Sequence, residues 1–166
     1  MKTSQLLPAF ILSLCTVAFA WGEPVAPIPA PAWTLKDVNG QAVSSEQFKG
    51  KVVVVDFWAT WCGPCRVEIP GYIELQKKYG PEGLVIVGMS LDAQGPGVVK
   101  KFMAQHGINY QIVMADDQVQ AEFGGKEGLT AIPTTFIIDR SGKIRDRKVG
   151  AEHTKDFEAR LVEYLK

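Results

Sequence analysis

Residues 51–65 read KVVVVDFWATWCGPC and decide the fold. The run of four valines has no polar alternation, which is typical of a central strand buried on both faces of a sheet. Two cysteines, Cys62 and Cys65, follow the strand and enclose Gly63 and Pro64. Apolar residues at helical spacing begin directly afterwards. The stretch therefore predicts a buried strand, a short turn, and a helix that begins at the cysteine pair.

Strands and helices alternate along the rest of the chain. Continuous apolar runs predict strands, and apolar residues at helical spacing predict helices. The expected strands span residues 32–35, 41–43, 51–58, 84–91, 110–114, 134–138 and 143–149, and the expected helices span 64–79, 96–106, 117–123 and about 154 to the end. This order predicts an α/β fold in which helices flank a central mixed β-sheet.

The first two expected strands form an N-terminal hairpin. Asn39 and Gly40 lie between them, and this dipeptide is favoured in tight hairpins because both residues accept positive backbone φ angles. Ser44 or Ser45 is well placed to cap a short helical turn that ends at Phe48. We therefore expect a small hairpin and one helical turn before the buried strand.

Length and charge favour one globular domain. The chain of 166 residues is long enough for a single hydrophobic core and too short for two domains of typical size. Hydrophobic residues make up 46% of the chain, and 18 basic side chains balance 18 acidic ones. Because no basic excess is present, nothing in the charge indicates a nucleic-acid partner. We expect one catalytic unit, present as a monomer.

Residues 1–20 have the features of a secretory signal peptide. Lys2 supplies a positive start, residues 6–19 are almost uninterrupted apolar sequence, and residues 18–20 (Ala-Phe-Ala) fit a small-x-small cleavage site. The alternative is an uncleaved membrane anchor, although the apolar stretch is shorter than the roughly 20 residues that span a bilayer. The sequence thus predicts an exported protein, periplasmic or otherwise extracytoplasmic, that meets a membrane only if the leader is retained.

Residues 21–31 contain four prolines among small residues, which predicts an extended linker before a folded domain at 32–166. Cys15 lies in the apolar leader and is lost if the leader is cleaved. The mature chain then keeps only Cys62 and Cys65, too few for a framework of structural disulfides. Export places this pair in a compartment where disulfides persist.

The spacing of Cys62 and Cys65 is typical of redox chemistry. Cys62 is expected at the start of a helix, where unpaired N–H groups and the helix dipole stabilise a thiolate, so it is the predicted nucleophile. Cys65 lies one helical turn later and is the predicted resolving thiol, within reach of a mixed disulfide at Cys62. Half of a zinc site is an alternative, but His106 and His153 stand alone and no metal site is expected. A passive structural disulfide is the other alternative.

Residues 56–65 (DFWATWCGPC) resemble the active-site strand and turn of thioredoxin, and residues 132–139 (IPTTFIID) resemble the segment that carries the cis-proline of that family. The resemblance covers 32–166 and implies a thioredoxin fold with a redox-active disulfide. It also implies a cis bond between Ile132 and Pro133, in a loop that faces the cysteines and leaves a backbone edge open for an extended substrate segment. An ordinary trans proline that opens a strand is the alternative.

The branch of the family is indicated by three further features: a helix and strand inserted at about 96–114 between the third strand and the cis-proline, the export signal, and Glu68 with the Ile-Pro pair after it. Together these resemble the TlpA/ResA-like exported reductases, which include proteins of cytochrome c maturation. Asp56 and the pair Gly63-Pro64 depart from that branch and match cytosolic thioredoxin. This favours a general reductase over a dedicated cytochrome role.

Two acids are candidate catalytic residues. Asp56 is expected within the buried strand, where a charge is costly unless its pKa rises or a partner satisfies it. The resemblance implies that Asp56 exchanges a proton with Cys65, directly or through water; the alternative is an acid that reaches solvent. Glu68 lies on the same helix face as Cys65. The resemblance implies a catalytic role for it too, although a glutamate early in a helix is favoured by the dipole alone.

The sequence thus predicts a thiol:disulfide oxidoreductase that reduces disulfides in other exported proteins, with Trp61 as a partly exposed surface beside Cys62 that partners contact. No bound cofactor is implied. The resemblance implies that a membrane-embedded thiol electron donor regenerates the dithiol. An oxidase or isomerase of the same fold remains an alternative, because the direction of electron flow depends on the reduction potential. A non-enzymatic module that binds partners at Pro133 is a further alternative.

Overall fold

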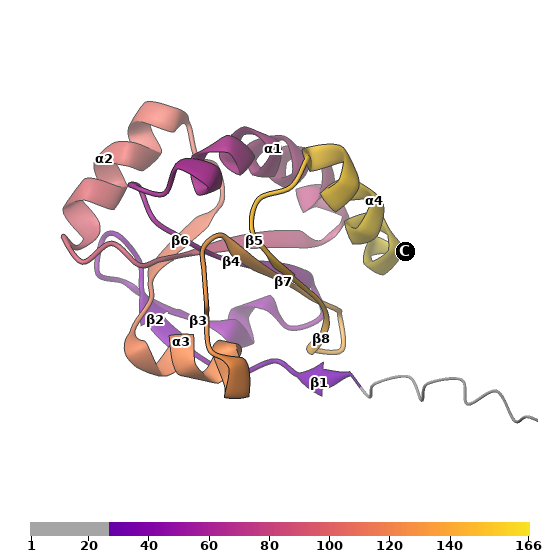
Figure 1. The fold of residues 1–166 in the computed structure, drawn as a ribbon. Coiled ribbons are helices and arrows are strands. Elements are labelled where there is room, and N and C mark those ends of the chain that lie inside the picture. The colour runs from indigo at the N-terminus through magenta and orange to yellow at the C-terminus, as the bar shows by residue number, and fades with distance from the viewer. Residues whose placement is uncertain (1–26) are drawn as a thin grey trace, which may run out of the picture.

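The computed structural model describes residues 27–166. The predicted signal peptide 1–20 and residues 21–26 of the predicted linker lie outside the described residues. The described strands and helices, in chain order, are β1 (Ile28–Pro29), β2 (Thr34–Lys36), β3 (Ala42–Ser44), β4 (Val52–Trp58), α1 (Gly63–Tyr79), β5 (Leu84–Ser90), α2 (Pro96–His106), β6 (Gln111–Met114), α3 (Asp117–Gly124), β7 (Thr134–Ile138), β8 (Lys143–Val149) and α4 (Thr154–Leu165), with three short 3-10 turns (Figure 1).

Six strands form the main sheet in the order β1-β8-β7-β4-β5-β6. β4 pairs in parallel with β5 and antiparallel with β7, so the sheet is mixed. The predicted α/β class with a central mixed sheet is therefore confirmed, and β4 is the central strand that its valine run predicted. The predicted insertion is also confirmed, since α2 crosses over to β6, which adds a parallel strand beside β5.

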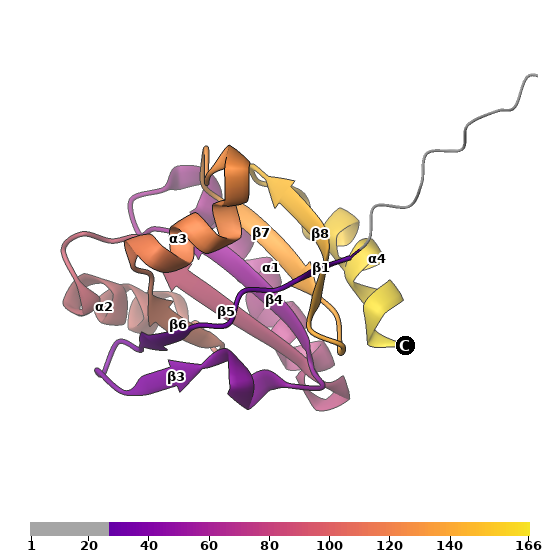
Figure 2. The same ribbon diagram turned by 90° about the horizontal axis from the view of Figure 1, so that it is seen from below.

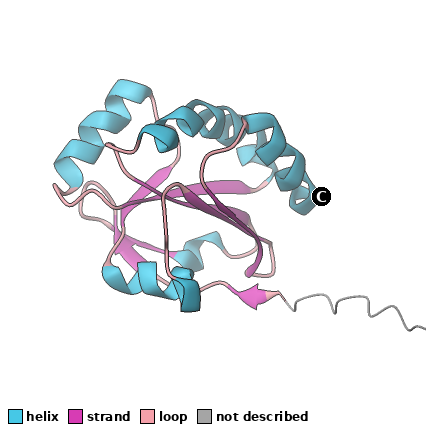
Figure 3. Cartoon of the chain, viewed as in Figure 1, coloured by secondary structure: helices cyan, strands magenta, loops and turns pink. Residues whose placement is uncertain are grey.

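Side chains of β4 alternate between two hydrophobic cores, because successive residues of a strand point to opposite faces. Val52, Val54 and Trp58 pack with residues of α1, α2 and α4. Val53, Val55 and Phe57 pack with the β2–β3 hairpin and α3. Figures 1 and 2 show these two layers on opposite faces of the sheet, and Figure 3 shows the strands lying between helices. All seven residues of β4 are buried.

The N-terminal hairpin is present as a separate two-stranded sheet, β2 with β3. Its turn differs from the expected one, because Gly40 alone has a positive φ (81°) and Asn39 does not. The Asp37 carboxylate instead accepts hydrogen bonds from the backbone N–H groups of Asn39 and Gln41, both at 2.8 Å. The prediction that both residues of Asn39-Gly40 adopt positive angles was wrong, because this aspartate organises a longer loop. The expected helical turn follows at Ser45–Phe48, capped by Ser44.

The ordered sheet begins earlier than Ala32, where the folded domain was expected to start. Ile28 and Pro29 pair with Ile144 and Lys143 of β8. A proline is tolerated there because β1 is an edge strand, whose outward backbone groups need no partner in the sheet. The prolines that favoured a linker are therefore compatible with a short strand at residues 28–29.

Helix α1 runs across the sheet and carries the cysteine pair at its first turn (Figure 1). It packs closely on α4, and a Cβ atom added at Gly71 would overlap the side chain of Thr154. Pro70 lies within α1 and removes one backbone hydrogen bond of the helix. The close contact with α4 fixes the position of the active-site helix over the central strands.

Candidate active site

Cys62 and Cys65 form a disulfide at the N-terminus of α1, with Cα atoms 5.3 Å apart. Cys62 is the N-cap residue, and its sulfur accepts a hydrogen bond from the backbone N–H of Cys65 at 3.2 Å. The exposed fractions are 5% for Cys62 and 2% for Cys65. Because that N–H group and the helix dipole both stabilise negative charge on the Cys62 sulfur, the geometry suits a thiolate nucleophile at this position.

The loop before β7 brings Pro133 against the disulfide. The bond between Ile132 and Pro133 is cis. The Cys62 sulfur lies 3.8 Å from the carbonyl oxygen of Ile132, a contact that becomes an S–H···O hydrogen bond only when Cys62 is a thiol. The carbonyl of Pro133 accepts a hydrogen bond from Gly150 at 2.8 Å, which joins this loop to the segment that follows β8.

The surface beside the disulfide is partly apolar. Trp61 is 64% exposed and Val67, on the first turns of α1, is 75% exposed. Gly63 and Pro64 between the cysteines are exposed as well. A protein partner that approaches the buried Cys62 sulfur would therefore meet apolar side chains next to it.

Asp56 is buried on the α1 face of the sheet, with 4% exposure. Its Oδ1 accepts a hydrogen bond from the Thr135 hydroxyl at 3.2 Å. Burial and, to a smaller extent, the charge of Glu68 together raise the pKa of Asp56 to about 8, although the Thr135 hydrogen bond opposes the rise. The predicted placement of this acid in the core is confirmed, so the alternative of an acid that reaches solvent was wrong.

Glu68 lies one turn after Cys65 and is also buried, with 6% exposure. Its Oε1 accepts a hydrogen bond from the backbone N–H of Glu152 at 2.9 Å, whereas the buried Oε2 has no hydrogen-bond partner among the described residues. Burial and the charge of Glu152 raise the pKa of Glu68 to about 7, although the hydrogen bond from the Glu152 N–H group and the charge of Lys148 oppose the rise. Two buried acids with raised pKa values therefore lie on the α1 side of the sheet, and the charge of Glu68 acts on the titration of Asp56.

An ion-pair cluster fixes the loop that contacts Glu68. Arg160 of α4 donates two hydrogen bonds to the Glu152 carboxylate, at 2.6 and 2.7 Å, and a third to Asp146 of β8 at 2.6 Å. Paired hydrogen bonds from a guanidinium to one carboxylate define the geometry as well as the contact. The backbone N–H of Glu152 is thereby held in place for Glu68.

Sequence reasoning missed a third buried acid near the site. Asp92, 4% exposed, follows β5 and accepts hydrogen bonds from the Thr60 backbone N–H at 3.0 Å, the Thr60 hydroxyl at 2.5 Å and the Ser90 hydroxyl at 2.9 Å. Thr60 lies two residues before Cys62, so Asp92 anchors the turn that presents the nucleophile. The only local signal was an acid that directly follows a buried strand.

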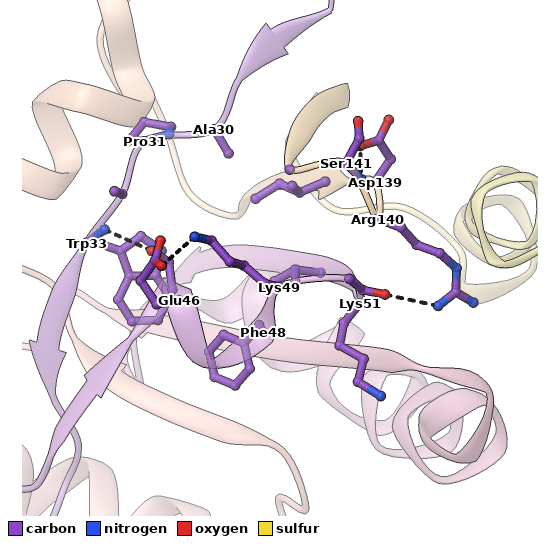
Figure 4. Close-up of a pocket in the computed structure, with 16 residues that line it drawn as sticks. Ala30, Pro31, Trp33, Glu46, Phe48, Lys49, Lys51, Asp139, Arg140 and Ser141 are labelled. Atoms are coloured by element: carbon purple, nitrogen blue, oxygen red, sulfur yellow. Dashed lines mark hydrogen bonds and ion pairs between the residues drawn. The ribbon is translucent and has the colours of Figure 1, made fainter.

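A groove of about 390 Å³ lies at the other end of the sheet (Figure 4). Its walls are residues 30–33, the turn at Ser45–Phe48, the start of β4 and the β7–β8 turn. Arg140 at its rim donates hydrogen bonds to the carbonyls of Gly50, Glu82 and Leu165, so its charge serves to join chain segments. Because Cys62 follows the opposite end of β4, the groove is separate from the redox site.

Two structural features are absent from residues 27–166. No cluster of three or more His, Cys, Asp or Glu side chains is arranged to hold a metal ion in this part of the chain. Within the same range, no helix has the length and apolar character needed to cross a membrane.

Comparison with known proteins decides the family. The Redoxin family profile matches residues 26–164. The chain belongs to the Redoxin family. Among curated relatives, the thiol-disulfide oxidoreductase ResA of Bacillus anthracis is 34% identical over 137 residues, which cover 82% of this chain and 75% of ResA. The thioredoxin-like protein YneN of Bacillus subtilis is 33% identical over 133 residues, covering 80% of this chain and 76% of YneN.

Solved structures of Redoxin relatives show the same fold. The thiol:disulfide interchange protein of the thioredoxin family from Chlorobium tepidum has a TM-score of 0.79 and 36% identity, covering 87% of this chain and all of that one. A second protein of this organism, described as a putative DsbE, has a TM-score of 0.76 and 33% identity, with coverages of 84% and 97%. The predicted thioredoxin fold and ResA-like branch are therefore confirmed, and the protein is a thioredoxin-like thiol:disulfide oxidoreductase.

Proposed function

We propose that this oxidoreductase works as a reductase of disulfides in exported proteins. The observation that carries the proposal is the placement of Cys62. Its sulfur lies at the N-terminus of α1, where an N–H group stabilises the thiolate, and 3.8 Å from the Ile132 carbonyl, next to the exposed Trp61. The acids Asp56 and Glu68 are both buried.

The proposed reaction begins with the dithiol form. The Cys62 thiolate attacks one sulfur of a substrate disulfide, forming a mixed disulfide and releasing the other substrate sulfur as a thiolate, which takes a proton. The Cys65 thiol then gives its proton to Asp56, and its sulfur attacks that of Cys62. This forms the Cys62–Cys65 disulfide and releases the second substrate thiol, so two electrons pass from the enzyme to the substrate.

Asp56 is suited to this step because its pKa of about 8 lies close to the ordinary thiol value of about 8.5. Proton transfer between groups of matched pKa needs little free energy in either direction. In this proposal Glu68 acts as a second acid whose charge keeps the pKa of Asp56 high. Substrates bind as an added strand at Ile132 and Pro133, with Trp61 contacting them next to Cys62 and Gly63-Pro64 forming the exposed turn.

The proposed setting is extracytoplasmic, reached through the predicted signal peptide 1–20 or with that segment kept as an anchor. A membrane-embedded thiol electron donor restores the dithiol, no bound cofactor takes part, and the protein acts as a monomer. Apocytochrome c is one candidate substrate, supported by the similarity to ResA and to the protein described as DsbE. The presence of Gly63 and Pro64 between the cysteines favours a broader range of substrates.

The reduction potential tests the direction of electron flow. The protein is equilibrated in graded glutathione or dithiothreitol buffers, and free thiols are counted after acid quenching. A potential near that of thioredoxin, about −270 mV, supports the reductase. A potential near that of DsbA, about −120 mV, would overturn it and assign the same residues to an oxidase.

A further inference from the structure

Two buried hydroxyl groups connect Asp56 to the active-site helix. The Thr135 hydroxyl lies 3.2 Å from Oδ1 of Asp56, and the Tyr72 hydroxyl lies 3.2 Å from the Thr135 hydroxyl. Thr135 sits directly across from Asp56 in the β4–β7 ladder, and Tyr72 lies on α1, 3% exposed. The three groups form one hydrogen-bonded chain, closed off from solvent, that joins the sheet to the helix of the cysteines.

The direction of the hydrogen bonds in this chain depends on the charge of Asp56. An ionised carboxylate can only accept, so the Thr135 hydroxyl must donate to it, and the freed lone pairs of Thr135 then accept from Tyr72. Both O–H dipoles point toward the carboxylate in that arrangement, and such aligned bonds strengthen one another. The chain therefore stabilises the ionised form of Asp56 more than the protonated form.

No cationic side chain among residues 27–166 stabilises the ionised carboxylate of Asp56, which forms no ion pair in this part of the chain. The titratable groups that face it are Glu68 and Tyr72 from α1 and Tyr110 from the segment before β6. Lys148 and Glu152 act on Glu68. On the β5 side the paired residue is Gly88, which has no side chain.

The neighbours of Gly88 leave no space for a side chain at this position. A Cβ atom there would lie 2.5 Å from Cδ1 of Ile112 and 2.8 Å from Nε1 of the buried Trp58. The strand next to Asp56 on this side therefore has no room for a polar partner. Favourable hydrogen bonding to the Asp56 carboxylate comes from the β7 side, through Thr135.

We propose that Thr135 and Tyr72 are positioning residues whose hydroxyl groups favour the ionised form of the Asp56 carboxyl group and thereby set the pH dependence of mixed-disulfide resolution by Cys65. This inference rests on the proposed role of Asp56 as the base for Cys65. It adds the two hydroxyl groups that determine which fraction of Asp56 is ionised, and so able to accept a proton, at a given pH. Neither hydroxyl contacts the reacting sulfur atoms, so neither is a catalytic residue.

The direct test is the titration of the Asp56 carboxyl carbon by NMR in the oxidised full-length protein. Thr135→Val removes the hydroxyl with little change of shape, and we expect the midpoint to rise by about one pH unit, since a hydrogen bond to a charged group is worth roughly that much. Tyr72→Phe should move it in the same direction by less. Thr135→Ser, which keeps a hydroxyl, should restore the midpoint.

The matched control is Tyr110→Phe. Tyr110 is buried, its ring lies 6.3 Å from that of Tyr72, and no hydrogen bond of its hydroxyl to another described residue is present. Loss of the Tyr110 hydroxyl should leave the midpoint of the Asp56 titration within a few tenths of a pH unit of the wild-type value. If Thr135→Val and Tyr72→Phe move the midpoint no further than Tyr110→Phe does, the proposal is overturned.

The second readout is the rate at which a preformed mixed disulfide at Cys62 is resolved, measured across pH. A midpoint raised by one unit leaves about tenfold less ionised Asp56 at pH 7, so the pH profile of Thr135→Val should move up by the same unit. Asp56→Asn is measured in parallel. Unchanged resolution in that variant rejects the proposed base, whereas the NMR midpoints test the hydroxyl chain separately, so the two failures are distinguishable.

Discussion

Replacement of Asp56 by asparagine should stabilise the oxidised protein, and the gain should grow as the pH rises. Asp56 is buried, with 4% exposure, and forms no ion pair among residues 27–166. Its ionised form is therefore poorly solvated in the fold. Asparagine has nearly the same shape and no charge, so the variant keeps the packing and removes the titration.

The size of the effect follows from the displaced pKa of Asp56. Burial first, and then the charge of Glu68, raise this pKa from 3.8 to about 8. Between these values the folded protein holds a proton that the unfolded chain releases, so the free energy of unfolding falls as the pH rises from about 4 to about 8. At about 1.4 kcal/mol per pKa unit, the loss has a ceiling on the order of 6 kcal/mol, and relaxation of the site toward water reduces it.

Urea unfolding of the oxidised wild type and Asp56→Asn, without reductant, measures this loss at about pH 5 to 9. The difference in unfolding free energy should widen up to about pH 8 and then level off, while Glu68 titrates in both proteins. Glu74→Gln is the control, because Glu74 is an exposed acid on the same helix. A difference in unfolding free energy between wild type and Asp56→Asn that stays constant from about pH 5 to 9 would refute the reasoning.

Three further predictions concern the resolving cysteine, the turn before Cys62 and the contact between α1 and α4. Cys65→Ser should leave the attack by Cys62 intact and trap mixed disulfides with substrates, detectable by non-reducing electrophoresis; absence of adducts would argue against the assigned order of the cysteines. Asp92→Ala should lower the free energy of unfolding by about 2–4 kcal/mol, because Thr60 loses its acceptor, and urea unfolding measures this loss. Gly71→Ala should cost about 1–3 kcal/mol through overlap with Thr154, and Thr154→Ala in the same chain should recover most of it; additive losses would contradict the overlap.

The elements of the fold could be predicted because local signals agreed with one another. The valine run of β4, the helical spacing of α1 and the exact spans of α2, β7 and β8 are all properties of neighbouring residues. The Asn39-Gly40 pair misled the turn prediction, since the Asp37 carboxylate organises the loop and Asn39 does not adopt a positive φ. The same local view missed β1, because two residues of an edge strand gain their stability from β8, far along the chain.

Some residues of the candidate site could likewise be predicted from local sequence, and others could not. Cys62, Cys65 and Pro133 stand in motifs that are continuous in sequence, so they could be named before the fold was known. The contact of Asp56 with Thr135 spans 79 residues, and that of Thr135 with Tyr72 spans 63. A threonine and a tyrosine at such separations carry no local pattern. Their association is a product of strand register and helix packing, which only the folded chain defines.

The absence of space at Gly88 also bears on how this enzyme can be re-engineered. A lysine placed beside Asp56 on β5 would be the direct way to lower the pKa of that acid. Its Cβ atom would already collide with Trp58 and Ile112, so the substitution would disturb the core before it changed the electrostatics. Variants with altered pH optima should therefore be sought on β7 and α1, where side chains already surround the acid, because substitutions at Gly88 should yield mainly misfolded protein.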